Sequence, residues 1–70
     1  MMEEARRLWQ LFDKYKETAE QHEFVRLLML DTKLVPAWND LQKNPHEGHA
    51  EIFVRVMKQV LDSLGVKHDS

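Results

Sequence analysis

The best-spaced residues that could do chemistry in this chain are two histidines. His46 and His49 stand three residues apart with Glu47 between them, so on a helix their imidazoles would share one face. Neutral imidazole is a common metal ligand, but two ligands do not complete a zinc site. A third would have to come from His22, from a carboxylate or from another copy of the chain. We keep His46 and His49 as weak metal candidates and favour a solvated N-terminal helical turn at this place.

Acid–base and nucleophilic catalysis have little support in the residue types. His22 lies near Glu20 and Glu23 in a polar stretch, where no pocket is expected to shift a pKa or exclude water. The chain has no cysteine, and neither Ser63 nor Ser70 stands in a nucleophile elbow. Its two glycines form no phosphate-binding loop. The sequence therefore predicts a protein that is not an enzyme and that has no cofactor.

Composition and charge argue against several classes of partner. The 70 residues include ten Lys and Arg and twelve Asp and Glu, which gives a net charge of −2. Both signs are spread along the chain, so a dedicated nucleic-acid surface is not expected. No apolar run approaches the roughly 20 residues of a membrane span, and no signal peptide is recognisable. Together with the absence of cysteine, these features predict a cytoplasmic protein without membrane contact.

The helix with the clearest boundaries is predicted over residues 45–64. Asn44 is a suitable N-cap, Pro45 suits the first helical position, and Glu47 stands where a capping-box acid would lie. Gly65 is placed for the left-handed residue of a Schellman C-cap, with Val66 packing back on the last turn. The apolar residues at helical spacing predict the buried face: Ala50, Phe53, Met57, Val60, Leu61 and Leu64.

Two more helices are predicted upstream, over residues 3–17 and 19–34. The first carries an apolar stripe at helical spacing: Ala5, Leu8, Phe12, Tyr15 and Ala19. Because the stretch between them contains neither Gly nor Pro, one continuous helix over 3–34 is the alternative. We favour a break, with Thr18 and Gln21 as a capping box, since thirty residues far exceed the mean helix length of about 11–12.

The second helix is predicted to end at Val35-Pro36, because the residue before a proline disfavours the helical conformation. Pro36 then opens a short helix, and Asp31 is interpreted as an inward-facing residue whose side chain caps the following turn. The predicted fold is therefore an all-α bundle of three main helices, over about 3–17, 19–34 and 45–64, plus a short helix after Pro36. Residues 1–66 form a single domain, and 67–70 form a polar tail.

The stretch 24–30 holds more apolar side chains than one helix face can carry. At about 100° per residue its apolar residues point almost all the way around the axis, with Arg26 as the one interruption. Fully burying a large apolar side chain stabilises a protein by roughly 1.5–3 kcal/mol, so a small domain gains little by leaving several exposed. We interpret this excess as a sign of a partner.

The sequence thus predicts a non-enzymatic protein-protein interaction or regulatory module that presents an apolar helical surface as a homodimer. We predict that four residues contact the partner, at the edges of the first apolar stripe and on the crowded helix: Trp9, Leu11, Val25 and Met29. The alternative that all four belong to the protein's own core is equally open.

Two other functions are kept as alternatives. The segment 24–43 resembles a helix, a turn and a helix, so a small transcription-associated or nucleic-acid-binding factor is the first. The surface of its second helix would present Asn39, Asp40, Gln42 and Lys43, one of which is acidic. Metal binding through His46 and His49 is the second alternative.

Overall fold

The computed structural model describes residues 1–18 and 22–68, which contain four helices and no strand. In chain order these are α1 (Met2–Thr18), α2 (His22–Thr32), α3 (Leu34–Lys43) and α4 (Glu47–Ser63). The all-α class is confirmed. The predicted division into three main helices and a short one is matched only roughly, because α1 and α4 have 17 residues each whereas α2 and α3 have 11 and 10.

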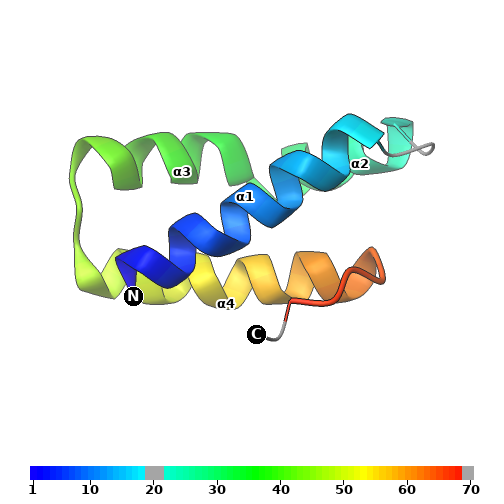
Figure 1. The fold of residues 1–70 in the computed structure, drawn as a ribbon. Helices are drawn as coiled ribbons and strands as arrows, with labels where there is room; N and C mark the ends of the chain where they lie inside the picture. The colour runs from blue at the N-terminus through cyan, green and yellow to red at the C-terminus, as the bar shows by residue number, and fades with distance from the viewer. Residues whose placement is uncertain (19–21, 69–70) are drawn as a thin grey trace.

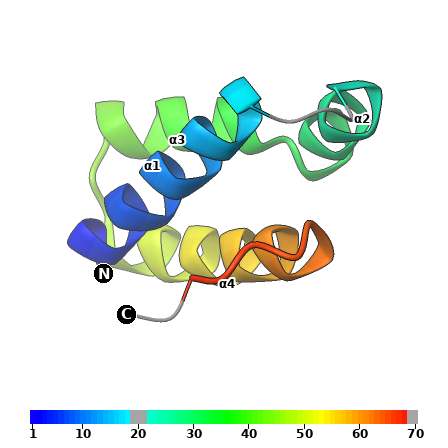
Figure 2. The same cartoon turned by 45° about the vertical axis from the view of Figure 1, so that its right-hand side comes forward.

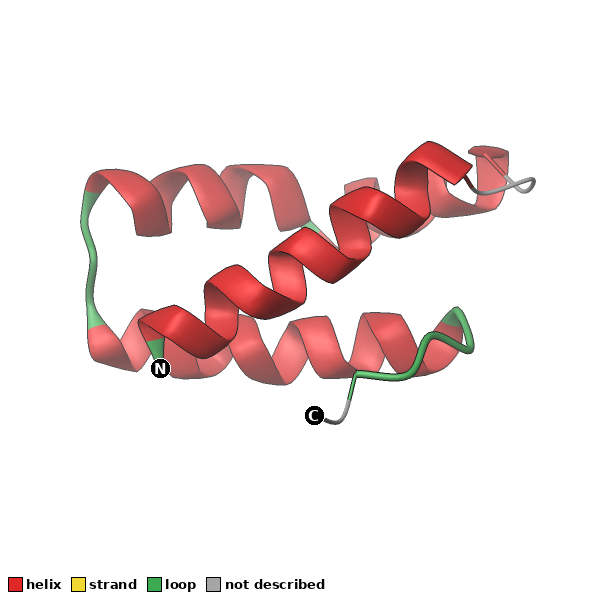
Figure 3. Ribbon diagram, viewed as in Figure 1, coloured by secondary structure: helices red, strands yellow, loops and turns green. Residues whose placement is uncertain are grey.

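Helices α3 and α4 run antiparallel, and α1 lies obliquely across both of them (Figure 1). Short connections join the helices in sequence, as Figure 3 shows for the turn between α3 and α4. Helix α2 lies at one end of the molecule, beyond the N-terminal end of α3 (Figure 2). The core therefore forms where α1 meets α3 and α4, and α2 is peripheral to it.

The apolar stripe predicted for the first helix is confirmed at the positions that are described. Ala5, Leu8 and Phe12 have no exposed surface, and Tyr15 is half-buried against the same core. Ala19 lies outside the described residues. The polar side faces solvent, and Arg7 donates two hydrogen bonds to the Glu4 carboxylate, at 2.5 and 3.2 Å. Helix α1 is thus amphipathic along its described length.

The predicted buried face of α4 is confirmed except at Leu64, the C-cap residue, which is half-buried, and Val54 is added to it. Its fully buried residues are Ala50, Phe53, Val54, Met57, Val60 and Leu61. At the C-terminus Gly65 has a φ of 72°, and the Val66 amide donates to the Leu61 carbonyl at 2.9 Å. The Gly65 amide donates to the Asp62 carbonyl at 3.1 Å, which completes the Schellman motif.

The predicted start of α4 is wrong by two residues. The N-cap is His46, in an extended conformation, and its Nδ1 accepts the amide N–H groups of Gly48 at 3.1 Å and His49 at 3.4 Å. Asn44 instead ends α3, where its amide donates to the Asp40 carbonyl at 2.9 Å. Because Asn44 belongs to the last turn of α3, the cap of α4 falls to the next residue with a suitable acceptor.

The boundary between α2 and α3 is also not where the proline predicted it. The chain turns at Lys33, which has a left-handed conformation with φ 54° and ψ 40°. Pro36 lies in the first turn of α3, where its missing N–H removes no intrahelical hydrogen bond. Asp31 is exposed rather than inward, and no side chain caps α3. The expected inward, capping role of Asp31 is therefore wrong.

Helices α1 and α2 are separate, so the continuous helix over 3–34 is not formed. The capping box expected between Thr18 and Gln21 lies outside the described residues. Near the C-terminus, the polar tail predicted over 67–70 is described as far as His68, whose Nε2 lies 2.7 Å from the Asp62 carboxylate. The residues after Gly65 thus return along α4 as far as they are described.

Candidate interaction surface

Four aromatic rings join the three core helices. The Trp9 ring stacks on that of Trp38, with centroids 5.4 Å apart and planes 13° from parallel. Phe53 packs against both indoles, at 6.3 Å from Trp9 and 5.4 Å from Trp38, and Phe12 lies 5.8 Å from Trp9. Offset-stacked and tilted arrangements of this kind are favourable for aromatic pairs. Trp9 therefore connects α1 to α3 and α4 within the chain.

The four residues predicted to contact a partner are placed differently from one another. Val25 is only 2% exposed and belongs to the protein's own core, and Trp9 packs in the aromatic cluster just described. Leu11 and Met29 are half-buried at the edge of the core. For Val25 and Trp9 the structure shows the intramolecular packing that was the alternative. Contact with a partner stays a prediction for all four.

Helix α2 has an exposed apolar face on the side opposite Val25. The side chains that form it are Phe24, Leu27 and Leu30, with exposed fractions of 47%, 52% and 62%. At about 100° per residue, Leu27 lies about 200° around the axis from Val25, so burying one of them turns the other outward. We call these three residues the α2 face. The stretch 24–30 was the correct signal for it, but sequence reasoning selected Val25 and Met29 rather than these three.

Charged groups flank the α2 face. Arg26 pairs with Glu23 at 2.6 Å, and both side chains are exposed. Asp31 borders Phe24, Leu27 and Leu28 around a shallow depression. The α2 face therefore has the Glu23–Arg26 ion pair on one flank and the Asp31 carboxylate on the other.

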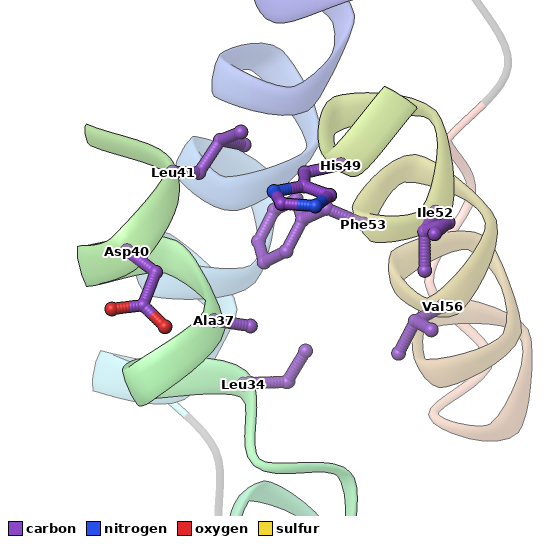
Figure 4. Close-up of a pocket in the computed structure, with 8 residues that line it drawn as sticks. All are labelled: Leu34, Ala37, Asp40, Leu41, His49, Ile52, Phe53 and Val56. Atoms are coloured by element: carbon purple, nitrogen blue, oxygen red, sulfur yellow. The ribbon is translucent and has the colours of Figure 1, made fainter. Parts of the chain in front are cut away.

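A second apolar surface is a groove between α3 and α4, on the side away from α1 (Figure 4). Its walls are Leu34, Ala37 and Leu41 from α3 and Ile52, Phe53 and Val56 from α4. Asp40 and His49 lie toward one end, and Ile52 is 56% exposed. The groove has a volume of about 220 Å³, below the roughly 300–1,000 Å³ of typical small-molecule sites. Its size and lining suit apolar side chains from another protein.

Among the groups considered for metal binding or catalysis, His46 and Ser63 have local structural roles. The His46 Nδ1 serves as the helix cap, and the His46 and His49 rings lie 4.6 Å apart. Within residues 1–18 and 22–68, no group of three His, Cys, Asp or Glu is arranged to hold a metal ion. The Ser63 hydroxyl donates to the Gln59 carbonyl at 3.0 Å. Glu20 and Ser70, like the side chain of His22, lie outside the part of the chain that the structure describes.

The ion pair between Glu4 and Arg7 perturbs one carboxyl. The hydrogen bond from Arg7 lowers the pKa of Glu4, and the positive charges of Arg7, Lys58 and His68 act in the same direction. This carboxyl lies on the solvent side of α1, so its shift reflects a surface pair rather than a catalytic site. The contact between His68 and Asp62 was missed by sequence reasoning, because it depends on the chain reversal at Gly65.

Helix α3 corresponds to the second helix of the helix–turn–helix pattern that was considered for residues 24–43. Asn39, Asp40, Gln42 and Lys43 are exposed, as the nucleic-acid alternative requires, whereas Trp38 and Leu41 are buried. The outward side of α3 thus carries one acidic and one basic residue, whereas a DNA-reading helix is usually set in a basic surface.

Comparison with known proteins gives no match to a protein-family model, to a curated protein or to a solved structure. None of the helices within the described residues has the length and apolar character needed to cross a membrane. The function is therefore argued from the surfaces of this fold alone.

Proposed function

We propose that this chain is a non-enzymatic protein-protein interaction module that forms a homodimer through the α2 face. The observation that supports this most directly is the exposure of Phe24, Leu27 and Leu30 on one side of a three-turn helix. Isolated exposed apolar residues are ordinary, but contiguous ones mark sites of association. The α2 face is contiguous because its residues follow one another at a spacing of three.

The surface area supports the same proposal. A monomeric protein of 8.4 kDa has an expected accessible surface of about 4,600 Å², whereas this chain exposes 5035 Å². The excess of about 400 Å² fits the peripheral position of α2 seen in Figure 2. Burying the exposed half of each side chain of the α2 face would stabilise the dimer by roughly 1 kcal/mol. In a symmetric dimer each of these residues is buried in both copies, so its contribution is made twice.

The alternatives have no comparable support among the described residues. Nucleic-acid binding would need a basic surface, which the outward side of α3 does not provide. Metal binding would need a third ligand near His46 and His49, and none is found among the described residues. Cytoplasmic location stays a prediction from composition.

Sedimentation equilibrium tests the proposal directly. At micromolar concentration we expect a mass of two copies of the 8.4 kDa chain. Leu27→Glu should give a folded monomer, because Leu27 is 52% exposed and its substitution leaves the core intact. Gln10→Glu, which adds the same charge on the outer side of α1, is the matched control and should leave the dimer unchanged. A monomeric wild-type chain with a cooperative melt would contradict the proposal.

A further inference from the structure

The molecule has a helix with an uncovered apolar face and a groove between two helices that no helix fills. We propose that in the homodimer the α2 face of each copy packs into the partner's groove between α3 and α4. This inference rests on the proposed function, and it adds which surface receives the α2 face. The exchange is reciprocal, so one two-fold axis covers both surfaces in both copies.

The dimensions of the two surfaces agree. Helix α2 has 11 residues and is roughly 16 Å long, so its face from Phe24 to Leu30 extends over roughly 9 Å. The α4 wall of the groove runs from His49 to Val56, which is roughly 10 Å. Ile52 lies midway along this wall and is 56% exposed, so an inserted Leu27 would meet an available apolar side chain.

The charges around the two surfaces are complementary in one orientation. With Leu27 pointing into the groove, Arg26 lies about 100° to one side of it and Asp31 about 40° to the other. When α2 runs in the same direction as the partner's α4, its Arg26 flank lies over the wall formed by α3, which carries the partner's Asp40 at the His49 end.

The other flank fits the same orientation. Asp31 then lies on the side of the partner's α4, toward the outer edge that carries the partner's Arg55. Arg26 and Asp31 are about 7.5 Å apart along α2. Their proposed partners are separated by a similar distance, because Asp40 lies at the level of His49 and Arg55 is about 9 Å farther along α4. Arg55 is exposed and reaches Glu51 only at 3.7 Å, so its guanidinium is accessible to a second carboxylate. Basic and acidic groups thus meet on both walls.

A dimer in which α2 packs only on the partner's α2 fits less well. A two-fold axis at Leu27 places Asp31 opposite the Glu23–Arg26 ion pair, since Glu23 and Asp31 stand four residues before and after Leu27. Such a dimer leaves Ile52 and the groove uncovered. A specific interface needs about 800 Å² from each partner, roughly one-sixth of the 5035 Å² surface here. Reciprocal packing uses two apolar surfaces of each copy toward that area.

Disulfide trapping tests the arrangement, because the chain has no cysteine of its own. Leu27→Cys and Ile52→Cys are prepared as separate proteins, and both sites are solvent-exposed in the monomer. When the two are mixed and oxidised, we expect a cross-linked heterodimer, since a disulfide needs Cα atoms within about 7 Å. Each variant alone should cross-link at least tenfold more slowly. Mixing Leu27→Cys with Gln10→Cys is the control and should give no heterodimer above background.

The outcomes separate this inference from the proposed function. A two-copy mass with cross-linking of Leu27→Cys to itself means that α2 packs on α2, which overturns the groove arrangement and leaves the homodimer standing. A two-copy mass without the Leu27–Ile52 cross-link also overturns it. A monomer overturns both proposals, and a mass that grows beyond two copies overturns the reciprocal exchange.

A charge exchange gives a second, independent measurement. Arg26→Glu and Asp40→Lys should each weaken dimerisation by up to about fivefold, as expected for exposed ion pairs. The double variant should recover most of the affinity, whereas Arg26→Glu combined with Lys14→Glu, remote from the groove, should not. Losses that simply add in the Arg26→Glu, Asp40→Lys double variant would show that the two side chains do not meet.

Discussion

Helices α1 and α4 make the most extensive contact between any two helices of the described residues, whereas α2 contacts the fold chiefly through α3. In α1 and α4 most apolar residues form one buried stripe, and Ile52 beside the stripe of α4 is 56% exposed. In α2 the apolar residues surround the axis, and among its described side chains Val25 alone is fully buried. The difference shows that apolar content does not fix where a helix packs. A single stripe has one way to be covered, whereas an apolar cylinder needs neighbours on two sides.

The largest expected effect separates the core from the α2 face. Phe12→Ala should lower the free energy of unfolding by about 3–5 kcal/mol, because Phe12 is fully buried and its removal leaves a cavity beside Trp9. Denaturant unfolding checks this, with far-UV circular dichroism to detect loss of the fold. An effect below about 1 kcal/mol would mean that α1 is held less firmly than its burial indicates.

The ends of α4 and α2 share a left-handed residue but differ in its type. Gly65→Ala should destabilise the fold by about 1–2 kcal/mol through the backbone alone, since no other atom lies within 4 Å of the added methyl group. Lys33→Gly should stabilise it by up to about 1 kcal/mol, because glycine adopts a φ of 54° without the steric cost. Thermal melts of both variants compare the two turns, and changes of the same sign would contradict the assigned conformations.

Two substitutions at the start of α4 test whether His46 or Asn44 is its N-cap. His46→Ala should cost about 1 kcal/mol of stability, because it removes the acceptor of two amide groups. Asn44→Ala should cost less, since the Asn44 contact to α3 is made by its backbone. If Asn44→Ala is the more damaging variant in a denaturant titration, the cap lies where the sequence placed it.

The α2 face should contribute little to the stability of the monomer. At concentrations too low for dimerisation, Leu27→Ala is expected to change the free energy of unfolding by no more than about 0.5 kcal/mol. At high concentration the same variant should lower the melting temperature, because stabilisation by the partner is lost. The measurement is a dilution series of melts for both proteins, and a melting temperature independent of concentration in the wild type would count against association.

The smallest effect comes from the solvent side of α1. The folded-state pKa of Glu4 is lowered by the Arg7 hydrogen bond, so this pair stabilises the fold above the unfolded-state pKa of about 4.3. That contribution is lost as the pH falls through the lower folded-state value. Glu4→Gln should therefore remove a small part of the acid-induced loss of stability, measured as melting temperature between neutral pH and pH 3. If the melting temperature of Glu4→Gln falls between neutral pH and pH 3 as much as that of the wild type, the Glu4–Arg7 pair contributes nothing to stability.

Much of the fold could be predicted where the sequence pattern is local and unambiguous. The stripe of α1, the buried face of α4 and the Schellman cap at Gly65 depend on residues within a few turns of one another, and all three are confirmed. The cap at His46 and the turn at Lys33 were missed because Asn44 and Pro36 carry strong local preferences that their neighbours override. Sequence reasoning found the stretch that holds the α2 face but not the residues that form it.

The apolar pattern alone is enough to predict an all-helical protein and the buried faces of α1 and α4, because one apolar stripe per helix can be covered in only one way. Which side of α2 turns outward depends on packing, since a helix that is apolar all around has no preferred side until a neighbour covers Val25. The groove beside Ile52 was equally invisible, because it exists only where α3 and α4 face each other without a helix between them.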